Sequence, residues 1–160
     1  MSIGVLGSER ADEEALKVAQ EVGRGIAEKG AILICGGRRG VMEAAAKGCR
    51  EAMGISIGIL PSLDKSEGNE YLDIVIPTSM GYGRNILVAS ASDVVIAVDG
   101  HYGTLSEAAF ALNYGRPVVV IVGTGGTADF LAGGPYDVHE ATDAKEAVDK
   151  AIRLAKSRKK

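Results

Sequence analysis

Aromatic residues are scarce in this sequence. Phenylalanine, tyrosine and tryptophan together make up 4% of its 160 residues, and there is no tryptophan. Few rings are therefore available to stack on the bases of single-stranded nucleic acid. The formal net charge of -3 adds to this argument, because nucleic acids and anionic membranes attract basic proteins. We expect neither nucleic acid nor a membrane among the partners of the protein.

Cysteine and histidine are also rare, with two residues of each. Cys35 and Cys49, like His101 and His139, lack the spacing of a metal site or a redox motif, so we expect no metal. Cys35 closes an apolar run and Cys49 lies on the apolar side of an expected helix, which favours two small buried hydrophobic residues over a disulfide. The sequence shows no export signal and no run of membrane-spanning length, and we expect a cytoplasmic protein.

Aliphatic residues, by contrast, are abundant, and they follow two alternating patterns. Short runs rich in valine and isoleucine are typical of parallel strands that are covered on both faces. Segments of helical period separate these runs, as expected for crossover helices. We predict one α/β domain over residues 1–160, a nucleotide-binding Rossmann-like domain with a doubly wound, mostly parallel sheet. Its expected strands are residues 3–6, 31–35, 55–60, 73–76, 94–98 and 118–122.

Four helices are expected from the apolar periodicity. Three of them, around residues 15–26, 41–52 and 105–112, are followed by glycine stop signals at Gly30, Gly54 and Gly115. The fourth begins near Asp143, which has capping-box spacing to Glu146.

The remaining segments lack periodicity. Residues 61–72 and 123–135 are predicted to be surface loops, and a loop beside a binding site could serve as a lid. The basic tail at about residues 156–160 is typical of a helix C-terminus or of a frayed end.

The most informative features are glycine-rich turns where a strand gives way to a helix, at residues 35–40 and 99–104. Glycine lets the backbone come close to a ligand, and the exposed amides at a helix start favour an anion. Two such turns in one sheet predict a shared crevice where the strand order reverses. The residues expected to bind phosphate there are Gly36, Gly37, Gly40, Gly100, Gly103 and Thr104.

Other phosphate-binding patterns fit less well. Neither turn matches the full dinucleotide fingerprint or the Walker pattern, so ordinary NAD or ATP chemistry is not favoured. A third turn, Gly7-Ser8, follows the first strand; it either holds phosphate through its amides or leads into the next helix.

Residues 100–107, Gly-His-Tyr-Gly-Thr-Leu-Ser-Glu, resemble the Pro-Gly-Gly-x-Gly-Thr-x-x-Glu signature of the LOG-like proteins, many of which are mislabelled as lysine decarboxylases. Residues 36–42, Gly-Gly-Arg-Arg-Gly-Val-Met, resemble the other glycine motif of that family, Gly-Gly-x-x-Gly-Leu-Met. The resemblance covers residues 7–117. The short length and residues 80–85, Met-Gly-Tyr-Gly-Arg-Asn, are more similar to the branch that includes molybdenum-cofactor carrier proteins.

The characterised LOG enzymes are phosphoribohydrolases, which release a free base from a nucleoside 5′-monophosphate. The resemblance implies this activity, with a purine substrate and without a metal or redox cofactor, rather than lysine decarboxylation. It carries the catalytic pair of the family onto Arg84 and Glu107. Cleavage of an N-glycosidic bond builds positive charge on the ribose, which a carboxylate can stabilise, while a guanidinium can bind phosphate or the departing base. The further ligand-binding residues are Gly7, Ser8, Met80, His101 and Tyr102.

The sequence departs from the LOG pattern at three positions. Asp99 replaces the proline of the signature, His101 replaces its second glycine, and Asn85 stands where the enzymes have lysine. These departures weigh against hydrolysis more than against binding. The alternative is a non-catalytic carrier of a phosphorylated pterin, with the molybdenum cofactor as ligand, or a nucleotide sensor. The resemblance also implies a homodimer or homotetramer whose neighbouring subunits complete the pocket.

Four of these residues have a second interpretation. Thr104 and Glu107 have capping-box spacing, and from spacing alone capping is favoured over catalysis; Arg84 and the resemblance reverse that preference. Arg84 is expected at a helix start, where the helix dipole disfavours a cation, which supports a ligand role. His101 either contacts the phosphate or is an exposed turn residue.

Overall fold

The computed structural model describes residues 1–158, which form seven strands and six α-helices. The strands are β1 (Ser2–Gly7), β2 (Ile32–Cys35), β3 (Ile55–Leu60), β4 (Ile74–Pro77), β5 (Val94–Val98), β6 (Val118–Ile121) and β7 (His139–Ala141). The helices are α1 (Glu13–Glu28), α2 (Val41–Glu51), α3 (Asn85–Ala91), α4 (Tyr102–Asn113), α5 (Gly126–Ala132) and α6 (Ala144–Arg158). Two short 3₁₀ helices are η1 (Lys65–Glu67) and η2 (Gly81–Arg84).

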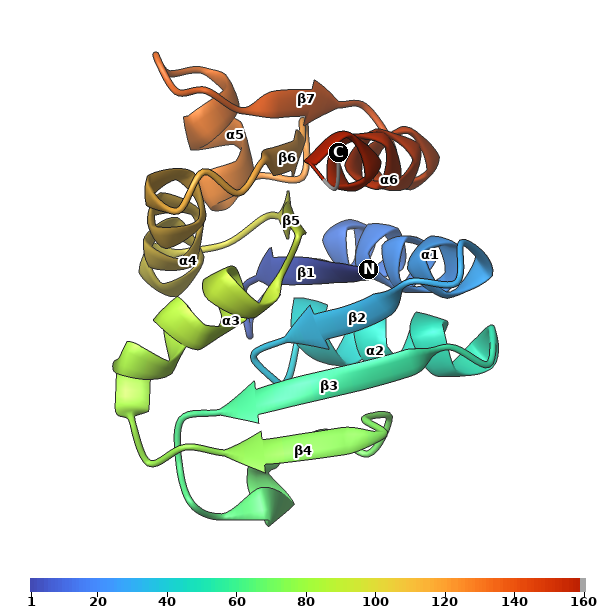
Figure 1. The fold of residues 1–160 in the computed structure, drawn as a ribbon, viewed down its shortest axis with the longest axis vertical. Coiled ribbons are helices and arrows are strands. Elements are labelled where there is room, and N and C mark those ends of the chain that lie inside the picture. Colours follow the sequence, from blue (N-terminus) through green and yellow to red (C-terminus); the bar gives the residue numbers. More distant parts are fainter. Residues whose placement is uncertain (159–160) are drawn as a thin grey trace.

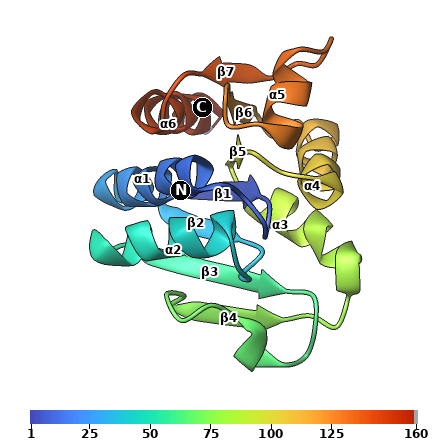
Figure 2. The ribbon, with the colours of Figure 1, turned by 180° about the vertical axis from the view of Figure 1, so that it is seen from behind.

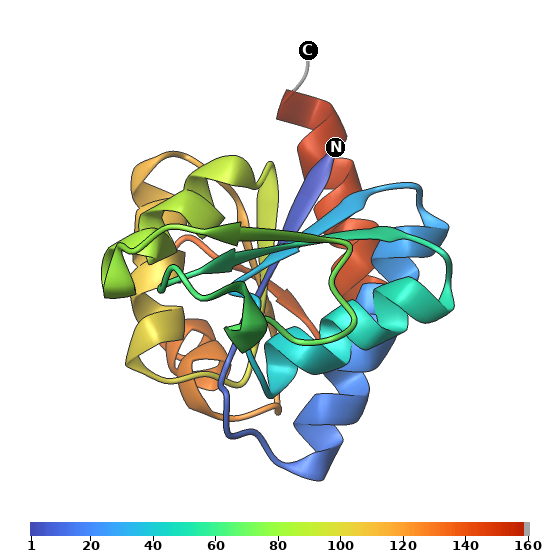
Figure 3. The ribbon, with the colours of Figure 1, turned by 90° about the horizontal axis from the view of Figure 1, so that it is seen from below.

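The strands form one parallel sheet in the order β4-β3-β2-β1-β5-β6-β7 (Figure 1). Helices α3, α4 and α5 cover one face, and α1, α2 and α6 cover the other (Figure 3). On the second face α1 lies between α2 and α6 (Figure 2). This arrangement confirms the predicted doubly wound α/β fold. The strand order reverses between β1 and β5, and a ligand-binding crevice is expected at that point.

Each face of the sheet has its own apolar core. Ile3 and Val5 of β1 belong to the core beneath α1, α2 and α6, whereas Leu6 belongs to the core beneath α3, α4 and α5. Both cysteines are free and buried, as predicted. Helices α1 and α2 approach closely because a Cβ atom at Gly23 would lie only 1.9 Å from the carbonyl oxygen of Ala45. This contact fixes α2, and with it the glycine turn that precedes it.

Three elements differ from the sequence-based prediction. The sequence does not predict β7 or α5, and of α3 it predicts only a helix start at Arg84, because each of the three is too short to show a period of its own. Residues 123–135 are not a loop throughout, since α5 occupies Gly126–Ala132 and buries Ala128 and Leu131. Residues 61–72 are a loop apart from the single turn η1.

The helix boundaries follow local chemistry. Gly30 and Gly115, which follow α1 and α4, have φ angles of 68° and 62°, as expected for glycine stops. After α2 the left-handed residue is Met53, with φ of 56°, and not Gly54. The basic residues 156–158 belong to α6, and residues 159 and 160 lie outside the described part. None of the helices within residues 1–158 has both the length and the apolar character needed to cross a membrane.

Candidate functional site

A cleft of about 480 Å³ opens at the carboxyl ends of the central strands, where the strand order reverses. The loops that follow β1, β2, β3 and β5, together with η2 and the first turns of α3 and α4, contribute its lining. The predicted shared crevice is therefore present. The predicted residues that line it are Gly7, Ser8, Arg84, His101, Gly103, Thr104 and Glu107.

The side chain of Arg84 lies against the glycine turn after β2. A Cβ atom at Gly36 would be only 2.0 Å from Arg84 Nη1, so the absence of a side chain there makes room for the guanidinium. Arg84 is the last residue of η2, and α3 begins at the next residue, as expected for a helix start. Arg84 is 8% exposed, and its Nε has no hydrogen-bond partner among the described residues. A buried N–H group without an acceptor is costly, and an anionic ligand atom could supply one.

Glu107 of α4 faces this arginine. Its Oε1 lies 3.5 Å from Arg84 Nη1, and both side chains are almost fully buried. Burial raises the pKa of Glu107 to about 7, and Arg84 opposes that rise without cancelling it. The pair brings the two predicted catalytic residues together, with a carboxylate that exchanges its proton near neutral pH.

The capping interpretation of Glu107 is wrong. The residue before α4 is His101, so Thr104 lies inside the first turn instead of capping it. The described residues give His101 no side-chain capping bond, and its exposed side chain lines the cleft. Glu107 therefore bonds to Arg84 rather than to a backbone amide at the helix start.

The glycine turn after β2 is held by its carbonyl groups. The amide nitrogen of Asn69 donates to Gly37 O at 2.9 Å, and its side-chain Nδ2 donates to Arg38 O at 2.9 Å and to Gly37 O at 3.3 Å. Within residues 1–158, the amides of residues 38–40 have no hydrogen-bond acceptor. The turn thus keeps its donors available, as an anion site requires.

The turn after β5 is built in the same way. The amides of Thr127 and Ala128 donate to Gly100 O at 2.8 Å and to Asp99 O at 3.1 Å, and Thr127 Oγ1 donates to His101 O at 2.9 Å. The first-turn amides of α4, at residues 102–104, have no acceptor in the described part of the chain. Asp99 and Gly100 adopt positive φ angles of 53° and 111°. The non-glycine residue Asp99 is therefore strained in a turn that opens on the cleft.

Asn85, one of the three departures, is part of the scaffold. Its Nδ2 donates to Ser106 Oγ at 2.8 Å and to Gly103 O at 3.4 Å, and the residue is 4% exposed. These bonds join the start of α3 to the first turns of α4. The position that holds lysine in the LOG enzymes is thus occupied by a neutral side chain engaged in the fold.

The first strand contributes a turn whose hydroxyl is already engaged. Ser8 Oγ donates to Arg10 O and accepts from the Arg10 amide, and Ser8 O accepts from the Val41 amide at 2.9 Å. A Cβ atom at Gly7 would lie 2.3 Å from Val41. Both residues thus place the start of α2 against the end of β1, while also lining the cleft.

The remaining predicted residues lie beside or beneath the cleft. Gly36, Gly37 and Gly40 shape the turn without lining it, whereas Gly100 and Tyr102 line a second, adjoining cleft. Met80 is half exposed and lines neither.

The structure also adds residues that the sequence did not single out. Arg10 and Arg38 line the cleft, and Arg38 Nη1 pairs with Glu9 Oε1 at 3.2 Å. Arg38 occupies a variable position of the glycine motif at residues 36–42, so the motif itself does not single it out. Only the position of Gly7-Ser8 and of that motif at the ends of strands could have indicated that Arg10 and Arg38 lie at the cleft. The opening of the cleft therefore carries cations in addition to the buried Arg84.

Comparison with known proteins identifies relatives of two kinds. The model of the SLOG cluster4 family matches residues 1–157. The molybdenum cofactor binding protein from Rippkaea orientalis is 37% identical, with 99% of this chain and 97% of that chain covered and a TM-score of 0.85. The molybdenum cofactor carrier protein from Chlamydomonas reinhardtii is 39% identical, with 96% of each chain covered and a TM-score of 0.81.

The second kind of relative is an enzyme. The cytokinin riboside 5′-monophosphate phosphoribohydrolase from Mycobacterium tuberculosis is 32% identical over 97 residues, which cover 59% of this chain and 52% of that protein. The match to this enzyme thus spans about half of its length, whereas the matches to the two cofactor proteins span nearly all of theirs.

The Asn69 bonds predict a local effect of substitution. In Asn69→Ala the carbonyl groups of Gly37 and Arg38 lose their side-chain donor, and we expect about 1–2 kcal/mol less stability to chemical denaturation. Hydrogen exchange at the amide of residue 69, which donates to Gly37 O, should become faster. The control is Asn113→Ala, at the exposed end of α4. Unchanged exchange at the amide of residue 69 would contradict the anchoring role.

The Glu107 pKa predicts a pH dependence of stability. Because the carboxyl has an ordinary pKa of 4.5 and a folded pKa of about 7, the folded state binds more protons between these values. The free energy of unfolding should therefore fall as the pH rises from 4.5 to 7. Glu107→Gln should remove this part of the slope in denaturant titrations across that range. Parallel pH profiles for the two proteins would show that Glu107 does not titrate there.

Proposed function

The chain belongs to the SLOG cluster4 family of LOG-like proteins, and on this premise we propose that it binds and delivers a phosphorylated pterin, such as the molybdenum cofactor, without chemical turnover. Two relatives whose names state cofactor binding or carriage match over nearly their whole length. The phosphoribohydrolase matches over about half of its own. We base the proposal on the two cofactor proteins because they match over nearly their whole length.

The site has the chemistry that such a ligand needs. Two sets of backbone amides and the unpartnered Nε of Arg84 are donors for phosphate oxygens. The cleft of about 480 Å³ is within the usual range for small-molecule sites. Arg10 adds positive charge to its lining, which attracts an anionic ligand, whereas Glu9 and Glu67 offset the charge of Arg38.

The bonding of Asn85 is the observation that carries the choice between carrier and enzyme. The LOG enzymes have a lysine there, whose ammonium would stabilise negative charge as a bond breaks. Here the neutral amide is committed to Ser106 and Gly103 and is 4% exposed. The site therefore keeps a phosphate clamp but has one cation fewer for catalysis.

Phosphoribohydrolysis is the second candidate, and the Arg84–Glu107 pair favours it. Glu107, with a pKa of about 7, could activate water or stabilise a cationic ribose, while Arg84 holds the phosphate. The reaction would break the bond between the ribose and the purine and add water across it. This reaction would have to proceed without the second cation that the LOG enzymes have beside the arginine.

One experiment separates the two functions. The purified protein is titrated with hydroxymethylpterin phosphate, and separately incubated with AMP and GMP while free base is followed by chromatography. We expect binding of the pterin phosphate, a loss of about tenfold or more in Arg84→Ala, and no base release. Base release that both Arg84→Ala and Glu107→Ala abolish would overturn the carrier proposal and establish the hydrolase.

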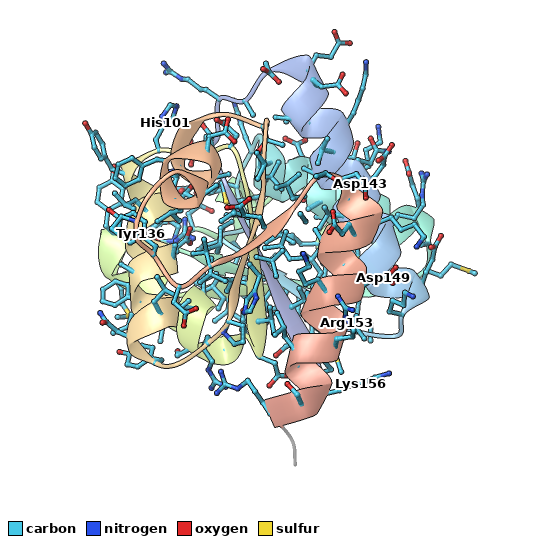
Figure 4. The ribbon with its side chains drawn as sticks, turned by 90° about the horizontal axis from the view of Figure 1, so that it is seen from above. His101, Tyr136, Asp143, Asp149, Arg153 and Lys156 are labelled. Carbon is cyan, nitrogen blue, oxygen red and sulfur yellow. The ribbon has the colours of Figure 1, made fainter. Side chains whose placement is uncertain are left out.

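We further propose that the α3–α4 face is covered by a second copy of the chain. Asp149, Arg153 and Lys156 project from α6 (Figure 4), whereas α3 has no charged residue and α4 has only the buried Glu107. A helix that is apolar on all sides is typically buried in a larger assembly.

The oligomer proposal predicts an effect of one surface charge. Ala109 is exposed in the middle of α4, and Ala109→Glu would place one carboxylate from each copy at the interface. Sedimentation should show an oligomer for the wild type and for the control Arg153→Glu on α6, but a monomer for Ala109→Glu. An Ala109→Glu protein that sediments like the wild type would place any interface elsewhere.

A further inference from the structure

A second cleft of about 380 Å³ adjoins the first, between the start of α4 and α5. Its lining includes the residues Tyr102, Leu105 and Phe130. The residues that line it include no lysine, arginine, aspartate or glutamate. It therefore suits an uncharged, apolar group, in contrast to the first cleft with its arginines.

Aromatic rings gather at this second cleft in a chain that has few of them. The protein contains five tyrosines and two phenylalanines. Tyr102 is 90% exposed and Phe130 is 56% exposed, and the ring of Tyr136 lies 5.7 Å from that of Phe130. Figure 4 shows Tyr136 on the same side of the molecule as His101. Large exposed rings beside a concave surface mark a contact site, and planar ligands stack on them.

The backbone at the base of this cleft is closely packed. Gly100 and Gly126 both line the cleft, a Cβ atom at Gly126 would lie 2.2 Å from Gly100 O, and one at Gly100 would lie 2.5 Å from the Thr104 side chain. The bonds from the Thr127 and Ala128 amides hold the two loops together. The two loops therefore meet backbone against backbone, which only glycine permits at these positions.

The two clefts share one wall. His101 lines both, and it immediately precedes the first turn of α4. That turn carries the free amides of residues 102–104, and Gly103 and Thr104 from it line the first cleft. The almost fully buried Arg84, with its unpartnered Nε, lines the same cleft. A ridge of anion donors thus separates a charged cleft from an apolar aromatic one.

From this arrangement we propose that the natural ligand has two heteroaromatic ring systems joined by a pyrophosphate. The pyrophosphate lies on the ridge, one ring enters the first cleft, and the second ring stacks between Tyr102 and Phe130. The inference rests on the proposed function and narrows its ligand to a dinucleotide-type molecule.

The experiment compares two probes that differ only by the second nucleotide. Guanine shares its aminopyrimidinone edge with a pterin, so GMP represents a one-ring ligand and diguanosine 5′,5′-diphosphate a two-ring ligand. Dissociation constants are measured by calorimetry. We expect the dinucleotide to bind about tenfold more tightly than GMP, the gain from stacking one base on aromatic side chains.

Substitutions at the second cleft test whether the tighter binding of the dinucleotide comes from that cleft. Tyr102→Ala and Phe130→Ala should each reduce the preference for the dinucleotide. Because Phe130 lies outside the first cleft, Phe130→Ala should leave GMP binding unchanged. Tyr114→Ala, which removes a half-exposed ring at the far end of α4, is the matched control and should keep the full preference. Far-UV circular dichroism verifies that each variant is folded.

The outcomes separate this inference from the function on which it rests. Equal affinity of the wild type for both probes, or a preference that survives in Tyr102→Ala and Phe130→Ala, overturns the two-ring ligand while phosphate binding stands. Failure of the wild type to bind GMP, diguanosine diphosphate and hydroxymethylpterin phosphate overturns the proposed function and this inference together.

Discussion

A buried guanidinium needs space and acceptors, and both demands shape this site. Arg84 reaches into the space that a Cβ atom at Gly36 would take, so the first glycine of the β2 turn and the arginine after η2 depend on each other. Burying a cation is costly unless it is paired, and Glu107 offsets part of that cost at 3.5 Å. The same burial raises the pKa of Glu107 to about 7. The Nε of Arg84 still lacks a hydrogen-bond acceptor, which an anionic ligand can provide.

The glycine turns show a second constraint, which concerns the direction of peptide groups. A turn offers amides to a ligand only if its carbonyl groups are satisfied elsewhere. Asn69 provides this for the turn after β2, and Thr127 provides it for the turn after β5. Each anchor lies more than twenty residues after the turn that it holds. The segments that cover the carboxyl edge of the sheet thus also determine which side of each turn faces the cleft.

This long-range anchoring explains how far the sequence could lead. Strands, long helices and glycine turns follow from local period and composition, so the fold could be predicted from them. The pairing of Arg84 with Glu107 is predicted by the resemblance to the LOG-like proteins. Asn69 has no local signature, because its partners Gly37 and Arg38 are far away in the sequence. The capping-box spacing of Thr104 and Glu107 does not correspond to a helix cap, because α4 begins earlier, at Tyr102. The carboxylate of Glu107 instead bonds to Arg84, which lies on another element.

A protein that binds a ligand stabilises the charge of its ground state, whereas an enzyme must stabilise the charge that develops in the transition state. Donors fixed by the fold bind a phosphate in its ground state, and tight ground-state binding alone does not accelerate a reaction. Catalysis needs a group whose interaction strengthens as the bond breaks, which a second cation beside Arg84 would provide. Asn85 instead donates hydrogen bonds to Ser106 and Gly103, and these bonds hold α3 against α4. The position beside Arg84 is thus left without a second cation, which agrees with the proposed carrier role and not with catalysis.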